Sequence, residues 1–242
     1  MATRAISNDI VFSTSQLPVE VTGMQSMASK MWAPMLIMGF MIVVVAFIIG
    51  IVNSGIASSY FEFSKLAREA ATTGQSLATQ KAWLESVKIW LPAFKFLGIG
   101  MLLGGVTFLL ATILGALRTG GGRVQEALGA EVRIIEPPMT AKIFPMLMMM
   151  GMMILIAALT VSIVTSTLSY SYWNHSIAAQ LNPALEGSAL LANLGTINAV
   201  KLWLEPLKFV GMASLFTGIG LALATIVRVL RWQSSRLWGL LS

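Results

Sequence analysis

Long apolar stretches without a charged residue occur four times along this chain of 242 residues. They cover residues 31–61, 96–117, 143–174 and 209–227. A helix needs roughly 20 mostly apolar residues to cross a hydrocarbon core about 30 Å thick, and each stretch is of about that length. The pattern predicts an all-α integral membrane protein with four transmembrane helices.

The second and fourth stretches belong to a sequence that occurs twice. Residues 87–118 and 200–231 align without a gap at an offset of 113, and fifteen of the 32 aligned positions are identical. Apolar matches would arise from composition alone, but matched lysines, tryptophans and glycines would not: Lys88/Lys201, Trp90/Trp203, Lys95/Lys208, Gly98/Gly211 and Gly105/Gly218. Pro34/Pro145 and Gly39/Gly151 extend the correspondence to the first and third stretches, at offsets of 111 and 112 residues. We therefore expect two tandem helical hairpins, parallel and related by a pseudo-twofold axis along the membrane normal.

This duplication divides the chain into five expected segments. Residues 1–30 form a polar N-terminal segment docked on a partner or on the membrane interface. Repeat 1 covers 31–118, a cytoplasmic linker covers 119–141, and repeat 2 covers 142–231. Residues 232–242 mix arginine with tryptophan, which is typical of an interfacial tail.

Turn-forming residues predict where the helices stop. Thr72-Thr73-Gly74 breaks a helical hairpin that extends the first two spans beyond the lipid, and Ser76 is placed to cap the next helix. Gly120-Gly121-Gly122 is expected to end the second span, ahead of a short helix over 123–133. The outer segment of repeat 2, which contains Pro183, is expected to be more broken than that of repeat 1.

Composition and charge support the membrane assignment. Hydrophobic residues make up 56% of the chain and charged residues 11%, against roughly 25% charged in a soluble domain. The formal charge of +6 does not indicate nucleic-acid binding, because the cations lie at the ends of the spans and form no stripe. Nine Lys and Arg fall on the side of the termini and seven on the other side. This bias favours cytoplasmic N- and C-termini. We expect the membrane to be a prokaryotic cytoplasmic (inner) membrane.

The sequence offers no constellation typical of an enzyme. It has no cysteine and one histidine, His175, so a thiol nucleophile, a thiolate metal site and a haem held by two histidines are all excluded within the chain. Phosphate-binding loops, nucleophile elbows and paired catalytic carboxylates are missing from the sequence. No acidic residue lies inside a span, which argues against proton or cation transport. We expect a chain without catalytic residues or a cofactor.

The repeated lysines are the sharpest polar feature. Lys88 and Lys95 lie seven residues apart, hence on one helix face, and Lys201 and Lys208 repeat the spacing. Near a helix end a long lysine can extend its ammonium to the interface, so interfacial anchoring is the first interpretation. Binding of an anionic lipid headgroup or of a quinone-like ligand is the alternative. The candidate lipid- and anion-binding residues are Lys88, Lys95, Lys201, Lys208, Trp90 and Trp203.

Small residues at helical spacing mark the second and fourth spans. In lipid they let helix backbones approach closely, which stabilises helix pairs where the hydrophobic effect does not act. A ligand groove at the same glycines is the alternative. The expected packing residues are Gly98, Gly100, Gly104, Gly105, Gly211, Ser214, Gly218 and Gly220.

Methionine recurs every three or four residues from Met24 to Met41, and again along the third span. Thioethers are soft ligands for Cu(I), but they are also flexible fillers of irregular apolar interfaces. Since no cysteine and one histidine accompany them, we favour a packing seam against a neighbouring protein. Under the metal alternative the Cu(I) candidates are Met35, Met38, Met146 and Met149.

Together these features favour a non-catalytic accessory or scaffolding subunit of a larger membrane protein complex. Its expected partners are other integral membrane subunits and membrane lipids. The alternative is a small membrane transport or ligand-handling protein that uses the pseudo-twofold bundle for a lipid, a quinone or Cu(I).

Overall fold

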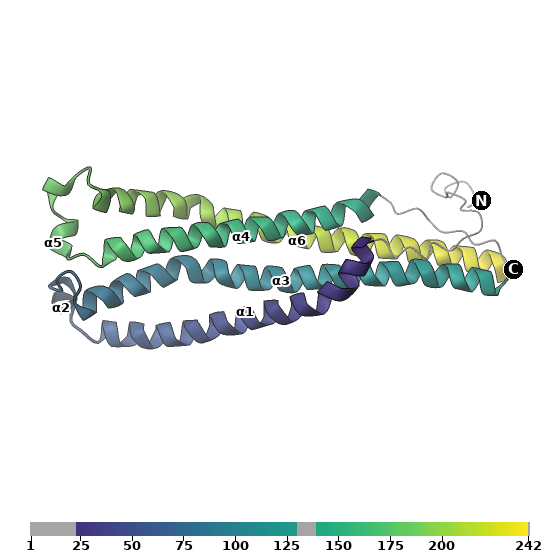
Figure 1. Cartoon of the computed structure of the whole chain (residues 1–242), viewed down its shortest axis with the longest axis horizontal. Coiled ribbons are helices and arrows are strands. Elements are labelled where there is room, and N and C mark those ends of the chain that lie inside the picture. Colours follow the sequence, from purple (N-terminus) through teal and green to yellow (C-terminus); the bar gives the residue numbers. More distant parts are fainter. Residues whose placement is uncertain (1–22, 130–138, 242) are drawn as a thin grey trace. The chain divides into compact units, whose positions relative to one another are not determined.

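Four long helices carry the four apolar stretches in the computed structural model (Figure 1). They are α1 (Gly23–Phe61), α3 (Ser76–Ala127), α4 (Met139–Trp173) and α6 (Ala189–Leu241). Three short elements connect them: α2 (Lys65–Glu69), α5 (Ile177–Gln180) and the 3-10 turn η1 (Pro183–Leu185). The structure describes residues 23–129 and 139–241, and these contain no strand.

All four long helices have the length and composition of membrane spans. Their most apolar windows have mean hydropathies of 3.1, 2.2, 2.5 and 2.0 in chain order. The helices exceed the roughly 20 residues that a bilayer requires. The prediction of an all-helical chain with four helices able to span a membrane is confirmed, which supports a multi-pass membrane protein.

The first helix starts earlier than the sequence indicated. It begins at Gly23, inside the segment expected to be polar, and Ala28 in its second turn is fully buried. Burial of this alanine side chain stabilises the beginning of α1, which the pattern of charged residues did not predict. The expected docking of residues 1–22 lies outside the described residues.

The expected end of the second span at three glycines is wrong. Helix α3 continues through residues 120–122 to Ala127, and the turn falls at Gly129, whose φ is +68°. Nε2 of Gln233 donates to the carbonyl oxygen of Leu117 at 2.7 Å, and its side chain occupies the space that a Cβ on Gly121 would fill. This tertiary contact offsets the low helix propensity of glycine. The separate short helix expected over 123–133 is also wrong for residues 123–127, which belong to α3. Residues 130–133 lie outside the described residues.

The helices form two compact units, and each long helix contributes residues to both. Among the described residues, unit 1 contains 23–37, 102–129, 139–150 and 214–241. Its apolar core joins α3, α4 and α6 through Leu114, Phe144, Ala222, Ile226 and Val229. The hydroxyls of Thr140 and Thr225 lie 2.9 Å apart beside this core.

Unit 2 contains Met38–Met101 and Gly151–Ala213. One cluster packs Ala46 of α1 on Val87 and Leu91 of α3, and another packs Ile89 of α3 on Tyr172 and Ile197 of α4 and α6. The two clusters bring all four long helices into this unit.

Polar contacts join the two connecting segments of unit 2. The backbone N–H of Ser176 donates to Oγ1 of Thr73 at 3.0 Å, and Oγ1 of Thr79 donates to Oδ1 of Asn174 at 3.3 Å. Gly74 takes a φ of +81°, as expected for a break at this glycine. The second connection contains α5, η1 and a left-handed Gly187, so it is more broken than the first, as the sequence predicts.

Candidate functional site

A pocket of about 270 Å³ lies in unit 2, where α1 ends and α3 begins. Two short stretches of chain shape its walls. Ser64 caps α2 by accepting from the N–H of Ala67 at 3.2 Å, and Ser176 caps α5 by accepting from the N–H of Ala179 at 3.3 Å. The lining residues come from α1, α2, α3 and α5: Tyr60, Phe61, Lys65, Arg68, Glu69, Lys81, Leu84, Glu85, Lys88 and Ile177.

Two cations of this pocket rest on aromatic rings. The guanidinium carbon of Arg68 lies 5.2 Å from the ring centre of Tyr60 and 4.9 Å from that of Phe61. Nζ of Lys81 lies 4.2 Å from the ring centre of Trp173. These distances are within the range of cation–π attraction. Within residues 23–129 and 139–241, neither cation has a carboxylate within 4 Å.

The other two cations of the pocket belong to ion pairs. Nζ of Lys88 lies 2.6 Å from Oε1 of Glu85, and Nζ of Lys65 lies 3.7 Å from Oε1 of Glu69. Both lysine side chains are largely exposed, so these pairs are weak. Four cations and two carboxylates give the lining an excess of two positive charges.

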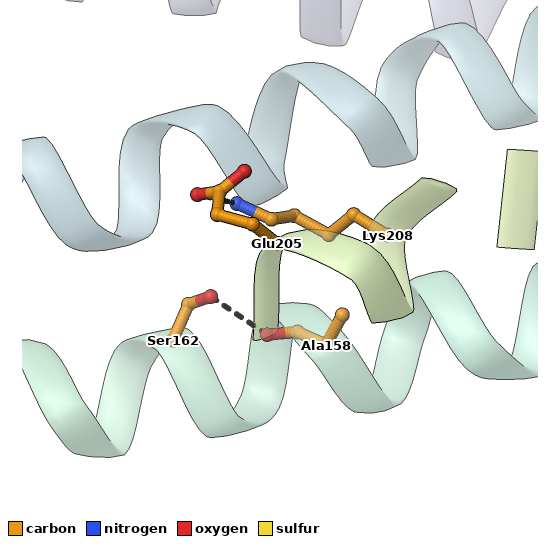
Figure 2. Close-up of polar contacts among 4 residues, drawn as sticks. All are labelled: Ala158, Ser162, Glu205 and Lys208. Carbon is orange, nitrogen blue, oxygen red and sulfur yellow. Dashed lines mark hydrogen bonds and ion pairs between the residues drawn. The ribbon is translucent and has the colours of Figure 1, made fainter. Parts of the chain in front are cut away.

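A second polar feature of unit 2 is a lysine inside the bundle. Lys208 of α6 is fully buried, and its Nζ lies 2.5 Å from Oε1 of Glu205 (Figure 2). Nζ also lies 5.7 Å from the ring centre of Phe96 on α3. A buried ammonium without a partner would be very costly, so the carboxylate and the ring together stabilise it.

Hydroxyl groups on α4 add to the polar interior of unit 2. Ser162, Thr165, Ser166 and Ser169 are all buried. Oγ of Ser162 donates to the carbonyl oxygen of Ala158 at 2.7 Å, as Figure 2 shows. Ser169 Oγ is buried without a hydrogen-bond partner among the described residues. Thr165 and Ser166 likewise donate to carbonyl oxygens one turn back on α4, so Ser169 is the hydroxyl of this group without a partner in the described structure.

Lysines and tryptophans at equivalent positions of the repeat have different surroundings in the structure. Lys88 lines the pocket, whereas Lys95 and Lys201 are exposed outside it. Trp90 packs beside the Ala46 cluster, and Trp203 is 47% exposed. Of the six predicted lipid- and anion-binding residues, Lys88 lines this pocket and the other five do not.

The glycines at equivalent repeat positions lie at equivalent contacts. In unit 2 a Cβ built on Gly98 would lie 3.2 Å from the carbonyl oxygen of Gly39, and one on Gly211 would lie 3.2 Å from that of Gly151. In unit 1, Gly105 meets Leu36 and Gly218 meets the backbone of Phe144. Each glycine lets two helices approach too closely for a larger residue.

The remaining small residues differ in their surroundings. Gly100, Gly104 and Ser214 are buried. Gly220 is exposed, and a Cβ there would meet nothing within 4 Å. Gly220 therefore makes no close helix contact in the described structure.

The four Cu(I) candidates lie on two helices. Met35 and Met38 belong to α1, and Met146 and Met149 belong to α4. Met38, Met146 and Met149 are 55%, 69% and 61% exposed, which is the environment of a surface seam. In the described part of the chain, no group of three or more His, Cys, Asp or Glu side chains is placed to hold a metal ion.

Sequence reasoning identified Lys88 but missed the neighbours that build the pocket. Arg68 and Lys81 belong to the seven cations that the charge pattern puts on the side opposite the termini, and no motif in the sequence sets them apart. The available signal was the aromatic pair Tyr60-Phe61, eight and seven residues before Arg68. Only the turn at Gly74, which brings α2 back beside α3, places these groups together.

Comparison with known proteins gives no relative for this chain. No protein-family model, no curated protein and no solved structure matches it.

Proposed function

We propose that this chain is a non-catalytic accessory or scaffolding subunit of a larger membrane protein complex. It acts through helix packing and lipid contacts in a prokaryotic cytoplasmic membrane, with both termini in the cytoplasm. Other integral membrane subunits are its partners, together with membrane lipids.

The observation that carries this proposal is the exposed apolar side of α1. Only 11% of its most apolar window is buried within the chain, against 28–39% for the other three long helices. The exposed positions include Met27, Met31, Met38, Met41 and Phe47. If this surface faced only lipid, ordinary aliphatic side chains would serve. Methionine has a flexible, unbranched thioether that packs well against an irregular protein surface. A methionine-rich seam is therefore better explained by a neighbouring helix.

The glycine contacts support the proposed architecture of two tandem parallel hairpins. Gly98 and Gly211 meet the carbonyl oxygens of Gly39 and Gly151 at the same distance of 3.2 Å. An ancestral hairpin that was duplicated would retain this pair of contacts. We infer that the exposed methionine surfaces of α1 and α4 arose from one original interface.

The experiment is purification of the full-length chain in mild detergent, followed by its mass on native gels. The proposal expects a complex in which this chain and a second integral membrane protein occur in fixed stoichiometry. Deleting residues 1–22 should leave the four spans inserted but release the chain from that complex. A lone monomer or homo-oligomer that transports a solute in liposomes would contradict the scaffold proposal.

Ligand handling is the second candidate function, and the polar interior of unit 2 favours it. Lys208 is fully buried beside Glu205, and the α4 hydroxyls lie in the same unit. An ammonium and hydroxyls at membrane depth suit the carbonyl or headgroup of a quinone or lipid. A lipid or quinone that co-purifies at one molecule per chain, and is lost from Lys208→Met, would support this candidate.

A further inference from the structure

The pocket at the end of α1 carries more positive charge than its own carboxylates neutralise. Glu69 and Glu85 pair with Lys65 and Lys88 and also attract Lys81 at longer range, which leaves an excess of two positive charges in the lining. Arg68 and Lys81 are the two cations of the lining without a carboxylate within 4 Å among the described residues. Both are held by rings, and neither has an ion-pair partner in the described structure. Nε of Arg68 is buried without a hydrogen-bond partner among the described residues. Because this nitrogen is buried, an anion in the pocket would meet the rest of the guanidinium group.

The chemistry of these cations selects the kind of anion. Arginine offers a planar set of donors that matches phosphate oxygens, and lysine adds a compact charge. The pocket volume of about 270 Å³ is slightly below the range for drug-sized ligands, so it accommodates a headgroup-sized moiety rather than a whole lipid.

The position of the pocket along the helices also indicates which kind of anion it binds. It is lined by Tyr60 and Phe61, the last two residues of the uncharged stretch of α1. Aromatic side chains at the end of a span favour the headgroup level of a bilayer, where lipid phosphates lie. Basic pockets beside spans are typical sites for anionic headgroups.

From these observations we propose that the pocket lined by Arg68, Lys81, Lys65 and Lys88 binds the phosphate group of an anionic ligand. The phosphate lies between the ring-stacked cations, and the weakly paired lysines turn from their carboxylates to meet it. An anionic lipid headgroup and a soluble phosphate compound share this chemistry. The site is independent of the scaffold function, because it requires neither a second subunit nor the methionine seam.

The test is a binding titration of the full-length chain in mild non-ionic detergent, read by native mass spectrometry. Short-chain phosphatidylglycerol and glycerol phosphate are the two probes, and phosphatidylcholine is the zwitterionic reference. The double variant Arg68→Gln/Lys81→Gln should weaken probe binding about 25-fold, since a surface cation contributes roughly fivefold to the binding of an anionic headgroup. The matched control Arg123→Gln/Arg231→Gln removes the same charge from exposed positions outside the pocket and should change binding less than twofold.

A variant that is expected to bind the probes more tightly controls for loss of binding through misfolding. Glu85→Gln removes a carboxylate from the lining and frees Lys88, so it should tighten probe binding several-fold. A folding defect would not produce a gain in affinity. If the double variant weakens the binding of phosphatidylglycerol, the ligand is a lipid. If it weakens the binding of glycerol phosphate and phosphatidylglycerol does not bind, the ligand is a soluble compound. If neither probe binds, if both double variants weaken binding equally, or if phosphatidylcholine binds as tightly as phosphatidylglycerol, the proposal is wrong.

Discussion

Nζ of Lys208 lies 2.5 Å from Oε1 of Glu205, three residues earlier on α6, and the lysine is fully buried while the glutamate side chain is 57% exposed. The pair therefore links a charge inside unit 2 to the surface of the same unit. Lys88 and Glu85 on α3 have the same spacing and a distance of 2.6 Å, but that lysine side chain is 63% exposed. The two pairs form a natural comparison of a buried and an exposed ammonium.

Glu205→Gln should destabilise the protein more than Glu85→Gln. The first change leaves a buried ammonium without its carboxylate, which costs 3–5 kcal/mol in fully buried pairs. Because Glu205 is itself more than half exposed, we expect about 1–3 kcal/mol, against at most about 1 kcal/mol for the exposed pair. Thermal unfolding in detergent, followed by circular dichroism, measures both variants.

Lys208→Met serves as the control for this comparison. An apolar side chain of similar length removes the cost of desolvating the charge, so the variant should be as stable as the natural chain or more stable. Strong destabilisation by Lys208→Met, with little effect of Glu205→Gln, would show that the lysine is held by something other than this pair.

Alanine at the close glycine contacts should weaken the hairpins. A Cβ on Gly98 would lie 2.8 Å from Cγ2 of Ile42 and 2.9 Å from Cγ2 of Val43, so the helices must separate. Overpacking of this kind costs about 1–3 kcal/mol, partly offset by about 1 kcal/mol of helix propensity. We expect a net loss of about 1 kcal/mol for Gly98→Ala, and a similar or smaller loss for Gly211→Ala, measured as the midpoint of unfolding in a denaturing detergent.

Gly220→Ala is the matched control, since it lies on α6 with nothing within 4 Å of the added Cβ. It should leave stability unchanged or raise it slightly. Equal losses at Gly98 and Gly220 would contradict the packing role of the close glycines.

Replacement of the four Cu(I) candidates by leucine should preserve assembly. Met35, Met38, Met146 and Met149 are expected to act as packing residues, and Met→Leu exchanges conserve volume at small cost. The complex should keep its mass on native gels, and elemental analysis should find no stoichiometric copper in the natural chain. A copper signal that disappears together with function in the variant would establish the metal alternative instead.

Single cysteines should report the orientation of the chain, which has none of its own. We expect Ser76→Cys and Glu186→Cys to react with an impermeant thiol reagent on intact cells, because the charge bias puts both outer connections outside. Ser234→Cys, near the C-terminus, should react only after the membrane is permeabilised. All three residues are exposed, so lack of reaction reflects sidedness rather than burial. Labelling of position 234 alone on intact cells would reverse the orientation.

The repeat illustrates what a sequence can and cannot specify about a site. Lys95 and Lys208 hold equivalent positions and carry the same chemistry, yet Lys95 is exposed and Lys208 is fully buried. Pro92 and Pro206 are 114 residues apart, one more than the offset of the repeat, so the two helices are not locally identical. The local sequences differ, since Glu205 stands three residues before Lys208 and Pro92 three residues before Lys95, but this difference does not predict which lysine is buried.

The sequence by itself determined the four long helices, the break at Gly74 and the less regular second connection. Each depends on properties of neighbouring residues: apolar length, absence of charge, and the backbone freedom of glycine. Tertiary structure decided that α3 continues through three glycines, that Lys208 is buried beside Glu205, and that Arg68 and Lys81 share a pocket. These outcomes depend on side chains from different helices, far apart in the chain, because burial and electrostatic balance are set by neighbours in space.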